Sequence, residues 1–383
     1  MANSLSFAFN LGVVAAQGKC SFTAVADILC AGPISDFRTQ SRHYLPASVG
    51  PVYKEKSAAI RQERSSAMTA PATNPQKWNV GLVGYGEVGR ILAEDLCRQD
   101  VKVMAFDVKL RSDEAGGPLR DHANHHGVRL TASHAELAAQ SDLVVSAVTA
   151  SQAVPVAEAC AGTVKRGAWF LDFNSASPGA KQRAAALIDG GGGRYIEGAV
   201  MTSIPPYRIR VPLLLGGKDA GELAPLIGAL GFNARVASEK LGVASAVKMC
   251  RSVMIKGLEA MVIESFTTAR AYGVEDAVLA SLKETFPGID WEKQGAYFFQ
   301  RVIEHGRRRS EEVREVAETV REIGLEPWSS QGTAERQAWM ADLADLGLFG
   351  ERGLEGFARS PDWRCEADRI LESIASKNKK TGK

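Results

Sequence analysis

No run of apolar residues in this sequence reaches the roughly 18–20 positions that a membrane-spanning helix needs. An excess of charge of one sign is also lacking, because 46 Lys and Arg stand against 44 Asp and Glu, a formal net charge of +2. This balance gives no electrostatic reason to expect a nucleic acid or an acidic membrane surface as a partner.

Cysteine is sparse and shows no paired spacing. The six cysteines, at positions 20, 30, 97, 160, 250 and 365, form no C-x-x-C motif and do not lie beside a pair of histidines. The sequence therefore predicts neither a zinc site nor a disulfide framework. Reduced thiols are typical of cytoplasmic proteins, so we expect a cytoplasmic location.

The length of 383 residues suggests two or three domains, and 45% hydrophobic with 23% charged residues excludes a disordered or collagen-like chain. Residues 1–67 differ from the rest and carry 7 Lys and Arg against 4 Asp and Glu. They could be an organelle transit peptide, but we favour an upstream start, with Met68 opening the protein proper. We expect residues 1–76 to be an irregular, disordered extension.

Between residues 77 and 240, short apolar runs alternate with stretches of helical periodicity. The apolar runs predict strands at 80–83, 101–106, 128–130, 143–148, 169–173, 195–200, 211–215 and 233–237. Helices are expected at 87–99, from Ser133, at 152–161, 178–189 and 220–230, and the polar stretch 108–126 is expected to be a loop. The alternation predicts an α/β domain of Rossmann type, a doubly wound parallel sheet.

After Ser238 the strand pattern stops. Residues 242–272 predict one long helix, which ends at Gly273. Further helices are expected near 275–285, 290–305, 310–323 and 330–346, and the basic tail after Lys377 is expected to fray. We therefore expect an all-α domain over 241–376, joined to the α/β domain by the long helix.

The strongest local motif is a G-x-G-x-x-G sequence between the first strand and the first helix. It reads Gly84-Tyr85-Gly86-Glu87-Val88-Gly89. Gly84 allows a tight turn, Gly86 lets a pyrophosphate approach the backbone, and Gly89 lets the helix pack on the strand. The free N–H groups at the helix N-terminus favour phosphate. The alternative, a glycine-rich turn without a ligand, is weakened by this context.

Asp107 ends the second strand, where an acidic residue accepts hydrogen bonds from the adenine ribose. A carboxylate also repels a 2′-phosphate, so the sequence favours NAD. Lys109 and Arg111 lie nearby and could hold such a phosphate, which leaves NADP open.

The long helix begins with mostly small or apolar residues around Lys248. Burial lowers the pKa of a lysine toward the range in which it exchanges protons near neutral pH. Ser252 and Lys256 follow at helical spacing on the same face. The alternative is a lysine on the helix rim whose ammonium group reaches solvent.

Together these features resemble the β-hydroxyacid dehydrogenase family, which includes 6-phosphogluconate and 3-hydroxyisobutyrate dehydrogenases. The resemblance covers roughly residues 77–330 and rests on the segments 84–89, 171–178, 197–200 and 242–248. The part after residue 240 is similar to a subgroup called 6-phosphogluconate dehydrogenase-like, through the segments 305–312 and 324–327.

The resemblance implies that Lys248 is the general acid/base, and that Ser252 stands where the family usually has asparagine. The family's Ser-Gly-Gly substrate segment is replaced by Met201-Thr202-Ser203, so the reaction type transfers but the substrate does not. The expected cofactor contacts are residues 84–89, Asp107, Val148, Thr149 and Asn174. The expected substrate contacts are Met201, Thr202, Ser203, Arg208 and Arg251.

Two groups of basic or metal-binding side chains have competing interpretations. Arg208 and Arg210 could clamp a carboxylate or phosphate, or could be a solvated strand edge. His122, His125 and His126 cluster, but no carboxylate joins them in the sequence, so we expect a solvated loop and no metal.

The sequence thus predicts an NAD(P)-dependent dehydrogenase for a small hydroxy acid or related polar alcohol, acting as a homodimer because the apolar face of the long helix needs covering. Two alternatives stay open. One is an imine or semialdehyde reductase on the same scaffold, and the other is a dinucleotide-binding sensor without turnover.

Overall fold

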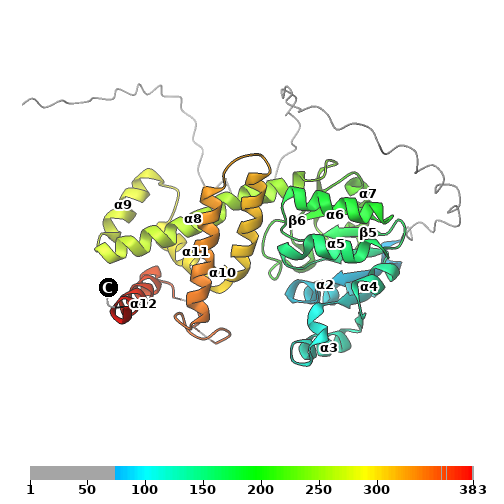
Figure 1. The fold of residues 1–383 in the computed structure, drawn as a ribbon, viewed down its shortest axis with the longest axis horizontal. Coiled ribbons are helices and arrows are strands. Elements are labelled where there is room, and N and C mark those ends of the chain that lie inside the picture. Colours follow the sequence, from blue (N-terminus) through cyan, green and yellow to red (C-terminus); the bar gives the residue numbers. More distant parts are fainter. Residues whose placement is uncertain (1–73, 355, 359, 382–383) are drawn as a thin grey trace, which may run out of the picture.

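The computed structural model describes residues 74–354, 356–358 and 360–381, which form an α/β domain followed by a helical domain (Figure 1). We expected residues 1–76 to be an irregular extension; residues 1–73 of this segment lie outside the described residues. The described helices include none that is both long and apolar enough to span a membrane.

A single sheet of eight strands forms the centre of the α/β domain, in the order β3-β2-β1-β4-β5-β6-β7-β8. Its strands are β1 (Asn79–Val83), β2 (Lys102–Phe106), β3 (Arg129–Leu130), β4 (Leu143–Ser146), β5 (Trp169–Asp172), β6 (Arg194–Val200), β7 (Leu213–Gly216) and β8 (Ala234–Ser238). The reversal of strand order between β1 and β4 is that of a doubly wound sheet, which confirms the predicted Rossmann-type fold.

The sequence predicted a sheet that is parallel throughout, and this prediction was wrong for one strand pair. β7 pairs antiparallel with β6, and β8 then pairs parallel with β7. The connection between β6 and β7 contains only the short 3-10 turn η4 (Arg208–Arg210). Because a parallel return needs a longer crossover, usually a helix, this short connection sends β7 back in the opposite direction.

Alternate residues of each strand pack on opposite faces of the sheet. On one face, residues such as Leu82 and Leu171 contact α2 (Glu87–Cys97), α3 (Asp113–His126) and α7 (Ala220–Ala229). On the other face, Val83 and Phe170 contact α4 (His134–Gln140), α5 (Ala153–Ala161) and α6 (Pro178–Gly190). The two layers of helices leave the carboxyl ends of the strands open.

The helix α3 corrects the prediction of a loop over 108–126. Ser112 caps its first turn by accepting a hydrogen bond from the Ala115 amide, and Gly127 ends it in the left-handed conformation. The helix was missed because it is largely polar and buries only Gly116, Leu119 and Ala123. As a result, the three histidines lie on a helix.

The helical domain consists of α8 (Val243–Tyr272), α9 (Glu275–Thr285), α10 (Trp291–Arg321), α11 (Trp328–Asp345) and α12 (Trp363–Thr381). The two helices predicted at 290–305 and 310–323 are one continuous helix, α10. Gly306 does not interrupt it, because its bare backbone lies against α11, where an added Cβ would come within 2.7 Å of the Gln337 carbonyl oxygen.

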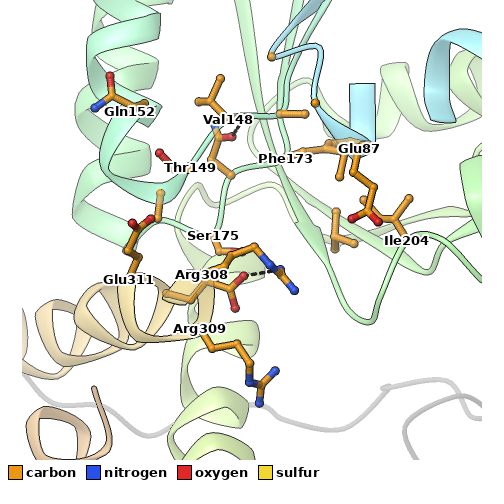
Figure 2. A pocket seen from close by; sticks show the side chains of 18 of the residues that line it. Glu87, Val148, Thr149, Gln152, Phe173, Ser175, Ile204, Arg308, Arg309 and Glu311 are labelled. Carbon is orange, nitrogen blue, oxygen red and sulfur yellow. Dashed lines mark hydrogen bonds and ion pairs between the residues drawn. The ribbon is translucent and has the colours of Figure 1, made fainter. Parts of the chain in front are cut away.

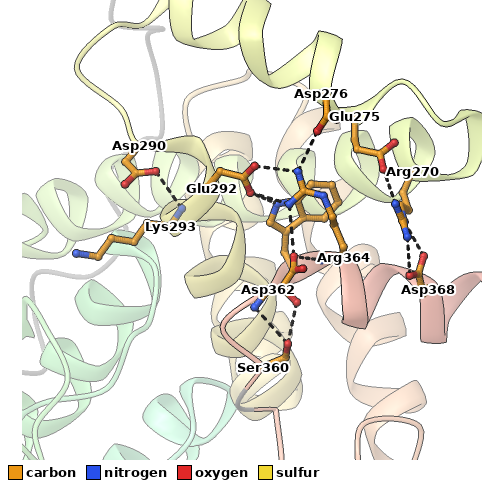
Figure 3. Close-up of polar contacts among 11 residues, drawn as sticks. Arg270, Glu275, Asp276, Asp290, Glu292, Lys293, Ser360, Asp362, Arg364 and Asp368 are labelled. Carbon is orange, nitrogen blue, oxygen red and sulfur yellow. Dashed lines mark hydrogen bonds and ion pairs between the residues drawn. The ribbon is translucent and has the colours of Figure 1, made fainter.

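Helix α12 was not predicted, and the tail after Lys377 continues this helix instead of fraying at that point. Arg364 on α12 bonds Glu292 of α10 at 2.8 Å and Asp276 of α9 at 3.3 Å (Figure 3). Arg270 of α8 bonds Asp368 of α12 at 2.8 Å. These ion pairs, with the buried side chain of Trp363, hold α12 on the other helices.

Candidate active site

A cavity of about 670 Å³ lies between the two domains. One wall is made by loops that follow the carboxyl ends of the strands, and the other by side chains of α8 and α10 (Figure 2). This is the place where doubly wound sheets bind ligands, at the switch in strand order. Its volume suits a substrate together with part of a cofactor.

The fingerprint turn opens onto this cavity through Gly84, Gly86, Glu87 and Val88. A Cβ added at Gly86 would meet no atom within 4 Å, so a phosphate has free access to this stretch of backbone. Gly86 is also the N-cap of α2, and no side chain caps the helix. The first N–H groups of α2 are therefore available to an anion, which fits a dinucleotide pyrophosphate.

The other two glycines of the motif hold the turn together. Gly84 adopts a φ of 90°, and a Cβ there would clash with the Ala147 carbonyl group. A Cβ on Gly89 would clash with the Gly84 carbonyl oxygen, because α2 packs directly on the turn. Gly89 therefore serves the motif by close packing and is not among the residues that line the cavity.

Asp107 lies beside this turn and lines the cavity. Its Oδ2 accepts a hydrogen bond from the Tyr85 amide at 2.8 Å, and its Oδ1 accepts one from the Lys109 amide at 2.9 Å. A carboxylate has about four lone-pair positions, so both oxygens can still accept from ribose hydroxyl groups. Lys109 also lines the cavity, as the sequence suggested.

The Tyr85 side chain points away from the cavity. Its ring is fully buried, and its hydroxyl lies 2.9 Å from Nδ1 of His122. Burial raises the pKa of Tyr85 above its usual value. Tyr85 thus serves the fingerprint turn through its backbone, while its side chain connects the turn to α3.

The loops after β4 and β5 are joined by Asn174. Its Oδ1 accepts a hydrogen bond from the Val148 amide at 2.7 Å, and its Nδ2 donates to Ser146 Oγ at 2.9 Å. Val148, Thr149 and Asn174 all line the cavity, so the structure brings these three predicted cofactor contacts together. The Asn174 amide therefore also shapes the loop.

Helix α8 starts against the sheet, on the side chain of Glu197. The Glu197 carboxylate is fully buried and accepts hydrogen bonds from the amides of Gly242 (2.7 Å), Ala244 (3.1 Å) and Ser245 (3.2 Å). A carboxylate at a helix N-terminus accepts hydrogen bonds from the free amides, and its negative charge interacts favourably with the positive end of the helix dipole. This cap fixes where α8 begins, and so sets the position of Lys248 over the cavity.

Lys248 lines the cavity in a half-buried position. Its Nζ donates a hydrogen bond to Ser175 Oγ at 2.5 Å. Burial lowers the pKa of Lys248 to about 8; Glu312 opposes this, while Lys256 and Lys181 add to it. At neutral pH, an amine with this pKa can both give and accept a proton.

Further along α8, Ser252 and Lys256, one and two turns after Lys248, form a second polar layer. Lys256 Nζ lies 3.2 Å from Ser252 Oγ and 3.1 Å from the Glu312 carboxylate of α10. Burial lowers the pKa of Lys256, an effect that Glu312 opposes. Burial would raise the pKa of Glu312, but Lys256, Arg308 and Lys248 together lower it to about 2. A buried, ionised pair therefore supports Ser252.

The predicted substrate contacts divide into two groups. Met201, Thr202, Ser203 and Arg251 line the cavity. Arg251 is exposed and makes no hydrogen bond or ion pair with the described residues, so its charge is free for a ligand.

Arg208 is not brought to the cavity. Its guanidinium group bonds Glu94 at 2.7 Å and Asp95 at 2.9 Å on α2, and it is absent from the cavity lining. The Arg208 side chain therefore holds the connection between β6 and β7 against α2.

Several cavity residues were not among the predicted site residues, namely Ser175 and, on α10, Arg301, Arg308, Arg309, Glu311 and Glu312. Arg308 lies at the cavity, where it bonds Glu312 at 2.7 Å, whereas Arg309 extends beside α8 (Figure 2). Arg309 pairs with the fully buried carboxylate of Glu259. The sequence shows the run of arginines at 307–309, but the place of Arg308 and Arg309 at the cavity depends on the packing of α10 on α8.

Two known families match parts of the chain. Residues 52–173 match the family described as "D-isomer specific 2-hydroxyacid dehydrogenase, NAD binding domain". Residues 269–340 match the family described as "Domain of unknown function (DUF1932)". The first match covers the fingerprint turn, and the second covers α10 and most of α11.

Two further relatives match most of the chain. A conserved hypothetical protein from Sinorhizobium meliloti 1021 has 35% identity and a TM-score of 0.62, over 78% of this chain and 96% of its own. An uncharacterized 28.5 kDa protein of Methanothermus fervidus is 30% identical over 65% of this chain and 93% of its own.

A third relative has a named activity. The mitochondrial 3-hydroxyisobutyrate dehydrogenase of Drosophila melanogaster is 24% identical over 61% of this chain and 71% of its own. The fold, the fingerprint turn and these relatives agree with the resemblance seen in the sequence. The chain belongs to the β-hydroxyacid dehydrogenase family of NAD(P)-dependent oxidoreductases.

Proposed function

We propose that this protein catalyses reversible hydride transfer between NAD and the carbinol carbon of a small hydroxy acid or related polar alcohol, with Lys248 as general acid/base. The observation that carries the proposal is the position of Lys248 Nζ in the cavity, hydrogen-bonded to Ser175 at 2.5 Å, with a pKa lowered to about 8. The fingerprint turn lines the same cavity.

The nicotinamide ring, when bound, supplies the hydride chemistry. In the oxidative direction, the neutral amine of Lys248 takes the proton of the substrate hydroxyl group. In the reductive direction, the ammonium form returns that proton to the carbonyl oxygen. Ser252 lines the cavity one turn along α8, where its hydroxyl can orient the same substrate oxygen. Its hydrogen bond with Lys256 keeps it in place.

The preference for NAD rests on Asp107, whose carboxylate faces the cavity beside the fingerprint turn. The negative charge there favours ribose hydroxyl groups over a 2′-phosphate. A cytoplasmic location remains a prediction from the cysteine pattern.

The substrate class rests on the positive charge of the cavity. Arg251 is free of protein partners among the described residues, whereas Lys256 and Arg309 are paired with carboxylates. A free guanidinium group at the edge of a cavity binds a carboxylate well, because it donates two parallel hydrogen bonds. Thr202 and Ser203 line the same cavity and can donate further hydrogen bonds.

Arg251→Ala is therefore expected to raise the KM for a hydroxy acid at least about tenfold, with a much smaller change in kcat, because a charged hydrogen bond made in both ground and transition states is lost. Steady-state kinetics on the variant measure both constants. Arg314→Ala removes an arginine of α10 that does not line the cavity and is the matched control. A fall in kcat with KM unchanged would contradict a substrate-binding role for Arg251.

The proposed reaction is tested by a spectrophotometric screen of hydroxy acids with NAD⁺ and NADP⁺ in parallel. A reductive panel of imines and semialdehydes with NADH is run beside it. Turnover of a hydroxy acid supports the proposal, and turnover confined to imines or semialdehydes replaces it with the reductase alternative. Tight cofactor binding without turnover in any arm would favour a sensor.

We also infer that the protein is a homodimer formed through α8. Val247, Met254 and Met261 are 43%, 71% and 61% exposed and recur every seven residues, so they lie on one face of the helix. Trp328, at the start of α11, is 77% exposed. Apolar side chains repeated along one helix face are typical of a covered interface.

Met254→Glu combined with Met261→Glu is expected to produce monomers, because two charges in an apolar interface cost much more than they do in water. Analytical ultracentrifugation distinguishes the two states. Val236→Glu places one such charge on an exposed apolar position of β8 and should leave the dimer intact. A wild-type monomer, or a dimer in the double variant, would refute this interface.

A further inference from the structure

Outside the cavity, α2 and α3 bring three potential metal ligands together. His122 and His126 lie one turn apart on α3, and Glu94 lies on α2. One ligand atom from each of the three residues lies within 4.8 Å of the other two. None of the three residues is among those that line the active-site cavity.

The sequence had suggested a solvated loop without a carboxylate. The structure changes both premises, because the segment is helical and Glu94 supplies the carboxylate from 28 residues upstream of His122. On a helix, residues four apart project from the same face, so the two imidazole rings can reach one ion. Their ring centroids are 4.5 Å apart.

The distances suit a small divalent ion. His122 Nε2 lies 3.2 Å from Glu94 Oε1. Ligand atoms bound to zinc at about 2.0–2.1 Å in a tetrahedral site lie about 3.3 Å from one another. This pair therefore already has the spacing of one edge of such a site. The third ligand, His126, has ring contacts but no hydrogen bond with the described residues, so its nitrogen atoms are free to turn toward the ion.

The surroundings also fit a ligand set. Tyr85 Oη lies 2.9 Å from His122 Nδ1, so the Nδ1–H group can donate a hydrogen bond to Tyr85 while Nε2 binds the ion. Such an outer partner orients metal-binding histidines in general. Arg208 occupies the other carboxylate oxygen of Glu94, Oε2, at 2.7 Å, which leaves Oε1 toward the histidines.

We propose that Glu94, His122 and His126 form a binding site for a divalent transition-metal ion of the zinc type, with water in the remaining position. Nitrogen and carboxylate donors in this number are those that zinc accepts in proteins. The site lies outside the cavity, so its role is structural. It joins α2 to α3 and, through Tyr85, supports the fingerprint turn.

The positive charges nearby limit the affinity. Arg98 and Arg208 both contact Glu94, and Asp95, which pairs with both arginines, offsets part of their charge. We therefore expect a micromolar dissociation constant, below about 10 µM, and not the tighter binding of closed structural zinc sites.

The test is isothermal titration of the metal-free full-length protein, produced without a polyhistidine tag, with Zn²⁺. A parallel titration with Co²⁺ is followed by visible absorption, which reports the coordination geometry. His126→Ala and Glu94→Gln each remove one ligand, and His125→Ala removes the neighbouring histidine outside the ligand set. Thermal denaturation and NADH binding of each metal-free variant show that it folds.

We expect one Zn²⁺ per chain in the wild-type protein and in His125→Ala, and a dissociation constant at least about tenfold higher in the two ligand variants. Binding that is absent in the wild type, or unchanged in His126→Ala, overturns the proposal. An equal loss in His125→Ala does so as well, because it shows that surface histidines bind the ion without a defined site.

Discussion

Lys248→Ala is expected to lower kcat by about 10²–10⁴-fold, because the general acid/base that manages the substrate proton is removed. The dissociation constant for NADH should change by less than about twofold, since cofactor contacts and the lysine lie on separate elements. Stopped-flow or steady-state kinetics, with fluorescence titration of NADH, measure the two quantities separately.

The control for this substitution is Lys218→Ala. Lys218 pairs with Asp189 at 2.9 Å, is 68% exposed and lies outside the cavity, so its loss should leave kcat unchanged. If Lys248→Ala keeps more than about a tenth of the wild-type kcat, Lys248 is not the general acid/base.

The pH profile gives the same hypothesis an independent test. Burial lowers the pKa of Lys248 to about 8. Oxidation needs the neutral amine, so kcat/KM for the alcohol should rise with pH and level off above about 8. Reduction needs the ammonium form, so its kcat/KM should fall as the pH rises through the same value. Identical profiles in the two directions would contradict the assignment.

Asp107→Ala is expected to weaken NADH binding at least about tenfold more than NADPH binding, because the ribose contact is lost and the repulsion of a 2′-phosphate is relieved. The variant should also bind both NADH and NADPH somewhat more weakly than the wild-type protein. The carboxylate accepts hydrogen bonds from the Tyr85 and Lys109 amides, so its removal loosens the fingerprint turn for either ligand. The ratio of the two dissociation constants is therefore the diagnostic quantity.

Two variants complete the measurement. Asp107→Asn keeps the shape of the side chain and removes its charge, so it isolates the repulsion. Asp113→Ala removes an exposed carboxylate that does not line the cavity and should leave the ratio unchanged. If Asp107→Ala lost the same affinity for NADH and for NADPH, the proposed contact between Asp107 and the ribose would be wrong.

The parts of the fold that were predicted correctly are those with local signals. Apolar runs marked the strands, and the glycine spacing marked the turn before α2. The direction of β7 was not visible, because it depends on a connection with no crossover helix. Helix α12 was missed because its partners lie far away in the sequence: Trp363, Ala367 and Ile370 pack in the core of the helical domain, and its arginine and aspartate pair with α8, α9 and α10.

The candidate site divides in the same way. Lys248 and the loop residues Val148 and Asn174 were predicted from their own segments, and the structure brings them to one cavity. Arg208 was expected there because it follows the substrate segment, yet the carboxylates of α2 draw it elsewhere. Glu312 could not be recognised, since only the packing of α10 on α8 places it beside Lys256.

The two halves of the cavity belong to separate hydrophobic cores. The apolar clusters around the sheet include no residue of α9 to α12, and the cluster around Phe299 and Trp363 includes no strand residue. Mutations that reshape the α10 wall can therefore accumulate without weakening the packing of the cofactor half. This modularity gives a route by which substrate range can diverge during evolution while redox chemistry is retained. Because Val262, Ile263 and Phe266 of α8 belong to the helical cluster, a chimeric enzyme would have to exchange α8 together with α9–α12.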